Sequence, residues 1–345
     1  LNDFIPVLKP NEKSEKNFRF LIKGSYADSV VLITLKMKEH YGKYAKDTSL
    51  FKLTLNRKLE KTKIEIESTV KETKIEAASF TSDVDKNIPS NKMKPNRFAL
   101  VVGNEDYKSK QPTLNSESNV EFAVADATIF KEYLVNVFGL DEKNIKLLAD
   151  ATAGELRQGI DWLTKLAKKY GNDAEIYFYY AGHGLPDETT KEPYVIPVDV
   201  NGSNLNSAIK LTEIYNSLSS TNASKITVFL DACFSGGARG SALIAARGVK
   251  IKPKNEILNG NIIVFAASTG EQSALPYKDK RHGMFTYFLL KKLKESKGNL
   301  TYKQLQDFLL KQVSFESSRT NSKDQDPQIL FGSEIKEKWE NWEIK

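Results

Sequence analysis

The chain has 345 residues, of which 40% are hydrophobic and 28% are charged, and its formal net charge is +7. This length and apolar content allow one or two packed domains and exclude an intrinsically disordered chain. No apolar run approaches the roughly 18 residues that a membrane-spanning helix needs. The single cysteine excludes internal disulfides and multi-cysteine metal sites.

The positive charge is concentrated in the first 96 residues, which hold 19 Lys and Arg against 13 Asp and Glu. Residues 97–345 hold 32 against 31. In the N-terminal part Lys and Glu alternate, which is typical of a solvated face. A nucleic-acid interface would show a basic stripe with interleaved aromatic residues. None is evident in the sequence, so we expect no nucleic-acid partner.

Residues 18–80 contain short segments in which apolar and polar or β-branched residues alternate. Such alternation predicts half-buried strands, and their number indicates a small antiparallel β-sandwich over residues 1–82. The predicted strands are Phe18–Ile22, Val30–Thr34, Leu50–Leu55, Lys63–Glu67 and Thr73–Ala77. Residues 83–96 are polar, aperiodic and contain two prolines, and are predicted to be a linker.

From residue 97 the chain alternates continuous apolar strands with helical patterns. Repeated units of this kind predict an α/β fold with a mostly parallel sheet and helices on both faces. The predicted strands are Phe98–Gly103, Ile145–Leu148, Ala174–Tyr180, Ile226–Leu230 and Ile262–Ala267. The predicted helices are Asn119–Phe138, Gly154–Tyr170, Leu211–Leu218, Met284–Leu293 and one that starts near Leu300.

Two of these strands end in residues that could perform nucleophilic catalysis. One runs into Ala-Gly-His183-Gly184 and the other into Asp231-Ala-Cys233. Functional groups of parallel sheets collect at the carboxyl ends of the strands. A catalytic cysteine needs a nearby proton acceptor and backbone N–H groups directed at the oxyanion. We therefore expect Cys233 and His183 to form a catalytic pair. Glycines on the nearby turns would let backbone N–H groups point at the oxyanion.

Simpler roles exist for these residues. A single cysteine at a strand end is often a small buried hydrophobic residue, and a single histidine is often structural. Their joint occurrence at adjacent strand ends favours catalysis. His282 precedes a predicted helix and is expected to be a cap or a surface residue. Ser235 is disfavoured as a nucleophile because its surroundings lack the G-x-S-x-G pattern.

The segment Tyr179–Gly184 resembles the histidine motif of the caspase-like clan of cysteine peptidases. Asp231–Gly236 resembles the cysteine motif in its metacaspase and bacterial orthocaspase form. The likeness extends from residue 97 to about residue 332. It implies a caspase–haemoglobinase fold behind the β-sandwich. A large-subunit-like part would cover 97–237, a loop 238–258 and a small-subunit-like part 259–345.

The resemblance implies a role for each motif residue. Cys233 would be the nucleophile, and His183 the general base and acid. The backbone N–H groups of Gly184 and Cys233 would form the oxyanion hole. The reaction would be peptide-bond hydrolysis through a thioester, with no cofactor and no bound metal.

Calcium activation is left open by the sequence. Asp187, Glu188 and Asp199 are acidic, but their spacing matches no calcium-binding loop.

Asp231 stands where caspases carry the glutamine of their aspartate-specific pocket, and Asp126 matches a second acidic position in metacaspase-like enzymes. Two carboxylates at the base of an S1 pocket would select Arg or Lys at P1, the residue before the cleaved bond. The alternatives are a helix-surface role for Asp126 and a local backbone contact for Asp231. Ala181 and Ala123 replace a serine and a cysteine of some metacaspases, which leaves fewer hydrogen bonds to the P1 side chain.

The segment 238–254 is basic and rich in glycine and small residues, as expected of a mobile loop. Self-processing occurs in this region of the family. An Arg- or Lys-specific enzyme would cleave after Arg239, Arg247 or Lys250. The alternative is an ordinary surface loop that is never cleaved.

The sequence thus predicts a cysteine endopeptidase that acts on proteins or peptides with exposed Arg or Lys. One alternative is a catalytically silent caspase-like scaffold or binding protein, and another is a peptidase of the same clan with a different P1 preference. Since the chain begins with Leu1, we expect an N-terminal piece to be missing. The missing piece could be a removed export signal, and we expect the protein to be soluble. The sequence leaves the role of the β-sandwich and the oligomeric state undecided.

Overall fold

The computed structural model describes residues 30–35, 49–54, 82–234, 253, 257–270, 272–321 and 323–345. The chain divides into two units, Leu1–Ser79 and Phe80–Lys345. In the first unit, β1 (Val30–Leu35) and β2 (Ser49–Thr54) form an antiparallel pair. Both coincide with predicted strands. The other strands predicted for the β-sandwich lie outside the described residues, so the sandwich stays a prediction.

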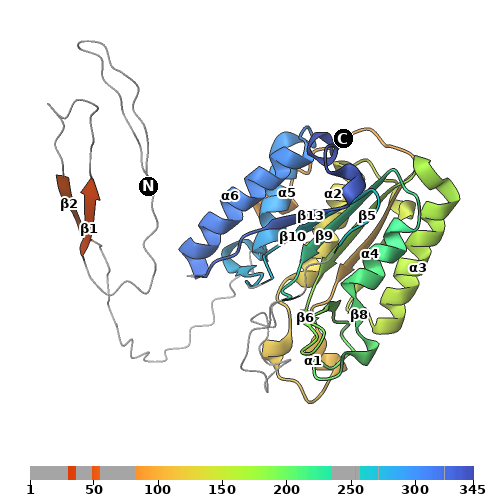
Figure 1. Cartoon of the computed structure of the whole chain (residues 1–345), viewed down its shortest axis with the longest axis horizontal. Helices are drawn as coiled ribbons and strands as arrows, with labels where there is room; N and C mark the ends of the chain where they lie inside the picture. The colour runs from red at the N-terminus through yellow and green to blue at the C-terminus, as the bar shows by residue number, and fades with distance from the viewer. Residues whose placement is uncertain are drawn as a thin grey trace, which may run out of the picture. The chain divides into compact units, whose positions relative to one another are not determined.

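A six-stranded sheet forms the centre of the second unit (Figure 1). The strand order is β13-β10-β9-β5-β3-β4, and only the β10–β13 pair is antiparallel. This confirms the predicted mostly parallel sheet and adds an edge strand, β13, that was not predicted. The bounds are β3 (Arg97–Gly103), β4 (Ile145–Ala149), β5 (Glu175–Ala181), β9 (Lys225–Asp231), β10 (Ile262–Ala266) and β13 (Gln328–Phe331).

Helices cover both faces of this sheet, as predicted. Side chains of a strand alternate between its faces, and β3 shows the result. Ala99 and Val101 pack with α2, α5 and α6, whereas Phe98, Leu100 and Val102 pack with α3 and α4. Both sets are buried, which explains why the strand is apolar throughout. The helices are α2 (Ala123–Asn136), α3 (Ala153–Tyr170), α4 (Leu211–Ser219), α5 (Met284–Ser296) and α6 (Tyr302–Asn321).

Smaller elements gather at the carboxyl end of the parallel strands. Figure 1 shows α1 and the β6–β8 sheet at this end, with the C-terminus of the chain at the opposite end. The sequence patterns did not predict them, because each is too short to show periodicity. They are α1 (Tyr107–Lys110), β6 (Gly184–Pro186), β7 (Pro193–Val195), β8 (Ile209–Lys210), β11 (Pro276–Tyr277) and β12 (His282–Gly283).

The segment of residues 82–96, which includes the predicted linker 83–96, belongs to the second unit and packs against the rest of it. It begins with a 3-10 turn, Asp83–Asp85, whose central residue Val84 is fully buried. Tyr133 Oη donates to the carbonyl of Val84 at 2.8 Å. The Asn91 amide donates to the carbonyl oxygens of Val137 at 2.7 Å and Lys297 at 3.0 Å. The Asn91 side chain thus fixes the segment to the C-terminal ends of α2 and α5.

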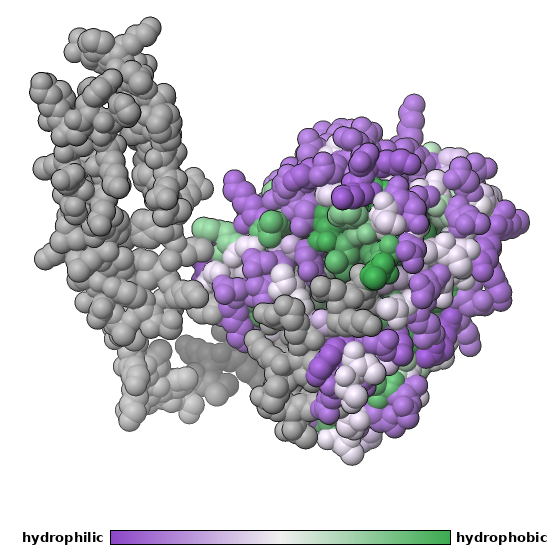
Figure 2. Space-filling view, in the orientation of Figure 1, coloured by the Kyte–Doolittle hydropathy of each residue, from purple (hydrophilic) through white to green (hydrophobic). Residues whose placement is uncertain are grey.

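On the face that Figure 2 shows, the surface of the second unit is mostly hydrophilic, and hydrophobic residues gather near the centre of that face. Among the described helices, none combines the length and apolarity that crossing a membrane requires.

Candidate active site

The two motif strands are neighbours at the centre of the sheet. Strands β5 and β9 run parallel, and Ala181 pairs with Asp231 at their carboxyl ends. His183 and Cys233 each follow two residues later, so both leave the sheet at the same edge. Their exposed fractions are 5% and 6%. The predicted pair therefore lies on adjacent strands in a nearly closed environment.

The His183 ring is held by a backbone carbonyl. Its Nε2 atom lies 2.8 Å from the carbonyl oxygen of Ser118. A carbonyl can only accept, so Nε2 carries the proton of this contact. In the neutral imidazole the lone pair is then on Nδ1, which is the nitrogen available as a base. The contact thus selects one tautomer.

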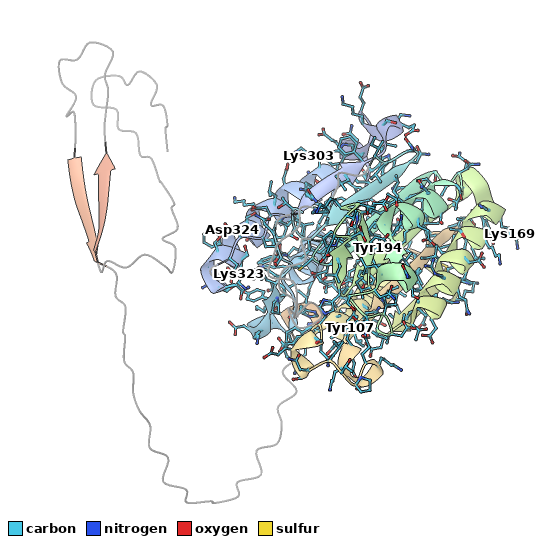
Figure 3. All side chains as sticks on the ribbon, turned by 60° about the horizontal axis from the view of Figure 1, so that its bottom comes forward. Tyr107, Lys169, Tyr194, Lys303, Lys323 and Asp324 are labelled. Carbon is cyan, nitrogen blue, oxygen red and sulfur yellow. The ribbon has the colours of Figure 1, made fainter. Side chains whose placement is uncertain are left out.

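Two tyrosines support the backbone of His183. The His183 N–H donates to Tyr107 Oη at 3.0 Å, and Tyr180 Oη donates to the His183 carbonyl at 2.7 Å. The Tyr107 ring also packs 4.5 Å from the imidazole, measured between centroids. Tyr107 comes from α1 and is labelled in Figure 3. Burial raises the pKa of Tyr107 well above its usual range, so the hydroxyl stays neutral.

The sulfur of Cys233 meets the backbone of a loop between β10 and β11. The N–H of Ala274 donates to Sγ at a distance of 2.8 Å, and the thiol donates to the Ala274 carbonyl oxygen at 3.5 Å. The shorter contact, from the N–H to sulfur, favours the thiolate, which is the nucleophilic form, whereas the longer one is made only by the thiol. This contact could not be predicted from residue type, because Ala274 acts through its backbone.

Side chains from the segment before β13 fasten this loop. Gln325 is fully buried, accepts from the Leu275 N–H at 2.9 Å and donates to the Ala267 carbonyl at 3.0 Å. Gln272 donates to Asp326 at 2.5 Å and accepts from its N–H at 2.7 Å. These four hydrogen bonds fix the loop that carries Ala274.

The backbone segments predicted to form the oxyanion hole approach closely. A Cβ atom built on Gly184 would lie 2.8 Å from the Cys233 carbonyl oxygen and would also collide with the Phe234 ring. Any larger residue would push these segments apart. Gly184 is therefore required by the close packing of β6 on the segment after β9.

Asp231 is fully buried and anchored to the start of α5. Its Oδ2 atom accepts from Thr286 Oγ1 at 2.8 Å and from the Thr286 N–H at 3.2 Å. Since the Thr286 hydroxyl proton goes to the carboxylate, Tyr179 Oη is the donor in its own 2.7 Å contact with Thr286 Oγ1. Since Thr286 is 55 residues away, Asp231 does not merely hydrogen-bond the local backbone, which was the alternative interpretation.

Asp126 lies in α2, fully buried, and both of its carboxylate oxygens are engaged. Oδ1 is 2.6 Å from His282 Nδ1, and Oδ2 accepts from the Gly283 N–H at 2.9 Å. Burial raises the pKa of Asp126 to about 6, the nearby charge of Asp231 adds to this, and His282 opposes it. Asp126 is thus not the helix-surface residue of the alternative interpretation.

His282 was expected to be a cap or a surface residue, and this expectation is wrong. Its exposed fraction is 1%, and its Nε2 atom lies 2.9 Å from Asp85 Oδ1 in the 82–96 segment. Burial disfavours the charged ring, but the hydrogen bonds to Asp126 and Asp85 outweigh it and raise the pKa of His282 to about 9. The ring is therefore an imidazolium between two carboxylates.

The residues considered for calcium do not gather into a site. Asp187 accepts from the N–H groups of Thr189 and Thr190 within its own turn, and Asp199 accepts from the Ala153 N–H at the start of α3. Within the part of the chain that the structure describes, no group of three or more His, Cys, Asp and Glu residues could hold a metal ion. Arg239, Arg247 and Lys250 lie outside the described residues.

The family model of the caspase domain matches residues 96–337. The chain belongs to the caspase-domain family. This confirms the resemblance seen in the motifs and the predicted fold class of the second unit. The family is one of cysteine peptidases, and both motif residues of the chain fall within the matched region.

Curated relatives of this caspase-domain protein include two peptidases. A probable protease from a Desulfuromonadales bacterium is 26% identical over 213 residues, which is 56% of this chain and 25% of the relative. Metacaspase-1 from Eremothecium gossypii is 26% identical over 210 residues, which is 55% of this chain and 42% of the relative. The alignments thus span less than half the length of either relative.

A solved structure shares the fold of the caspase domain. A Geobacter sulfurreducens protein matches with a TM-score of 0.50 at 18% identity, over 69% of this chain and 94% of that protein.

Proposed function

We propose that this protein is a cysteine endopeptidase that cleaves after Arg or Lys. The observation that supports this most directly is the pairing of Ala181 with Asp231, since it brings His183 and Cys233 to one edge of the sheet. Membership of the caspase-domain family adds the reaction type.

The reaction begins at the sulfur. Nδ1 of His183 takes the Sγ proton of Cys233, and the thiolate attacks the carbonyl carbon of the scissile bond. The negative charge that develops on the carbonyl oxygen is stabilised by the N–H groups of Gly184 and Cys233. His183 then returns the proton to the leaving amine, which leaves a thioester on Sγ. Water, activated by the same imidazole, hydrolyses this thioester and restores the thiol.

Substrate selection rests on the buried carboxylates. Asp231 precedes the nucleophile by two residues, and Asp126 is close enough for the charge of Asp231 to raise its pKa. In our proposal these two carboxylates form the base of the S1 pocket. Arg suits such a base best, because its planar fork can bond both acids. The substrates would be proteins or peptides with exposed Arg or Lys.

Self-processing would follow from the same specificity. Arg239, Arg247 and Lys250 offer cleavage points after the nucleophile motif. Mass spectrometry of the purified protein, with Cys233→Ala in parallel, would locate a cut. Fragments that end at one of these residues in the wild type alone are expected. An intact wild-type chain that hydrolyses peptides would restrict the enzyme to other substrates.

The primary test is hydrolysis of matched fluorogenic peptides with Arg, Lys, Asp or Asn at P1. Wild type, Cys233→Ala and Asp231→Asn would be assayed with calcium and with a chelator. We expect turnover of the Arg and Lys peptides that disappears in Cys233→Ala. The Asp231→Asn variant should mainly raise KM for these peptides.

Other outcomes would separate the alternatives. Turnover of only the Asp or Asn peptide would retain the nucleophile and reject the acidic pocket. A wild type that turns over no peptide with or without calcium would favour an inactive zymogen or a silent caspase-like scaffold, and an uncleaved 238–254 loop would then point to the zymogen.

A further inference from the structure

A buried histidine connects the 82–96 segment to a candidate specificity residue. The ring of His282 lies between Asp126 of α2, at 2.6 Å from Nδ1, and Asp85, at 2.9 Å from Nε2. The second oxygen of Asp85 accepts from the Ser82 N–H at 2.9 Å, which closes the 3-10 turn. Asp85 therefore belongs to the segment and to the cluster at once.

When both carboxyl groups are ionised, the two contacts require the charged ring. A neutral imidazole carries one N–H and can donate to one carboxylate, and its other nitrogen would direct a lone pair at the second carboxylate. Only the imidazolium donates to both. The His282 ring thus keeps its hydrogen bonds to both Asp85 and Asp126 when it is protonated, and it loses one of the two when the proton leaves.

The surrounding charges support the protonated ring. Two carboxylates contact the ring itself, and Asp231 acts on the cluster through Asp126. Asp83 of the same turn is paired with Lys280 at 2.9 Å. Tyr287 donates to the Asp83 carboxylate, and Lys294 donates to the backbone carbonyls of Asp83 and Lys86. Burial and the charges of Asp85 and Asp83 raise the pKa of the neighbouring Tyr133, which therefore stays neutral. Burial favours the neutral ring, but the two carboxylates in direct contact with it prevail.

We propose that Asp85 and His282 are positioning residues for substrate selection. Asp85 keeps the imidazolium in place, and the imidazolium holds the Asp126 carboxylate in the pocket that would receive a P1 Arg or Lys. The 82–96 segment is then part of the peptidase site rather than a tether between two units. This inference rests on the proposed function only in its last step, the effect on substrate.

The activity test compares two carboxylates of one turn. Asp85→Asn removes the charge that faces His282 and leaves one acceptor oxygen for two donors, His282 Nε2 and the Ser82 N–H. Asp83→Asn removes the same charge two residues away and leaves the ring untouched. With the P1 Arg peptide, Asp85→Asn should raise KM about tenfold and leave kcat unchanged. A tenfold loss of affinity is the effect expected when one hydrogen bond that positions a binding group is lost. Asp83→Asn should change neither. Asp85→Glu, which retains the carboxylate, should recover most of the lost affinity.

A second measurement does not depend on activity. The ring of His282 can be titrated by NMR in the intact protein, with His282→Gln to identify its signal. We expect it to titrate well above the usual range in wild type and in Asp83→Asn, and at a distinctly lower pH in Asp85→Asn.

The two measurements distinguish the failures. An ordinary titration of His282 in wild type, or equal titrations in the two Asn variants, would overturn the bridge. A raised titration in an enzyme that cleaves no P1 Arg or Lys peptide would retain the bridge and reject the proposed function. A raised titration with equal KM values in Asp85→Asn and Asp83→Asn would overturn the role in substrate selection.

Discussion

Ala181 and Asp231 are partners across the parallel pair of β5 and β9. Each is followed two residues later by a candidate catalytic side chain, so His183 and Cys233 leave neighbouring strands at equal depth. The pairing of two buried strands thus sets the location of both groups. Residues that fix the backbone beyond these strand ends should accordingly affect catalysis without contacting substrate.

Tyr107→Phe tests the support of the histidine. The variant loses the hydroxyl that accepts from the His183 N–H and donates to the Ile196 carbonyl at 2.8 Å. A buried N–H without an acceptor costs about 1–3 kcal/mol in the free energy of unfolding. We expect a loss of this size in urea denaturation and a fall in kcat of about tenfold through misplacement of the imidazole. Tyr170→Phe, at an exposed tyrosine, is the control. Equal kcat in both variants would contradict the prediction.

Gln325→Met tests the loop that carries Ala274. Methionine fills a similar volume but removes the side-chain hydrogen bonds to the Leu275 N–H and to the Ala267 carbonyl. We expect a loss of about 2 kcal/mol in the free energy of unfolding. Since the Ala274 N–H would no longer be held against Sγ, alkylation of Cys233 by iodoacetamide should require a higher pH than in wild type.

The control for this experiment is Gln158→Met, at an exposed position of α3. It should leave stability and alkylation unchanged. An alkylation profile of Gln325→Met that matches the wild type would show that the loop does not act on the thiol.

Arg97→Met tests the end of the sheet opposite the site. The Arg97 side chain is 2% exposed, pairs with Glu175 at 2.8 Å and donates to the carbonyl oxygens of Phe138 and Ile344. Because the Glu175 side chain is 26% exposed, we expect the loss of Arg97 to cost up to about 3 kcal/mol, the lower end of the range for a fully buried pair.

Arg157→Met is the matched control, because its partner Glu213 and Arg157 itself are both more than 40% exposed. Exposed pairs contribute less than about 1 kcal/mol. Urea denaturation of both variants measures the difference. Similar losses of stability in the two variants would show that the contacts of Arg97, including the one to the Ile344 carbonyl, do not hold the C-terminal residues against the sheet.

The charge of His282 should make stability depend on pH. Its pKa is raised from 6.5 to about 9 in the folded protein. A raised pKa means that the folded state binds the proton more tightly than the unfolded state does. The stabilisation is fully present below pH 6.5 and is lost as the pH rises to 9. A shift of this size corresponds to about 3 kcal/mol.

The measurement is urea denaturation of wild type and His282→Gln at pH values across this window. The wild type should exceed the variant most at the acidic end, and the difference should shrink toward the alkaline end. A difference that is constant with pH would show that the ring does not carry the charge.

The sequence determined the sheet and the position of the motifs. Buried parallel strands must be apolar along their whole length, so β5 and β9 are visible as continuous apolar runs, and the polar residues after them mark the functional edge. The periodicity also located α3 within one residue of its start. It placed the start of α2 too early, because Phe122 adopts a left-handed conformation (φ 74°) just before the helix begins.

Only the tertiary structure decided the partners of the polar residues. Asp126 and His282 are 156 residues apart in the chain, and Asp85 is 197 residues from His282. No local pattern encodes such contacts, since the helix and strand periods relate residues only a few positions apart. Ala274 contacts Cys233 through its backbone, for which residue type gives no signal. The sequence supplied the groups, and the packing of α2, α5 and the 82–96 segment decided which of them meet.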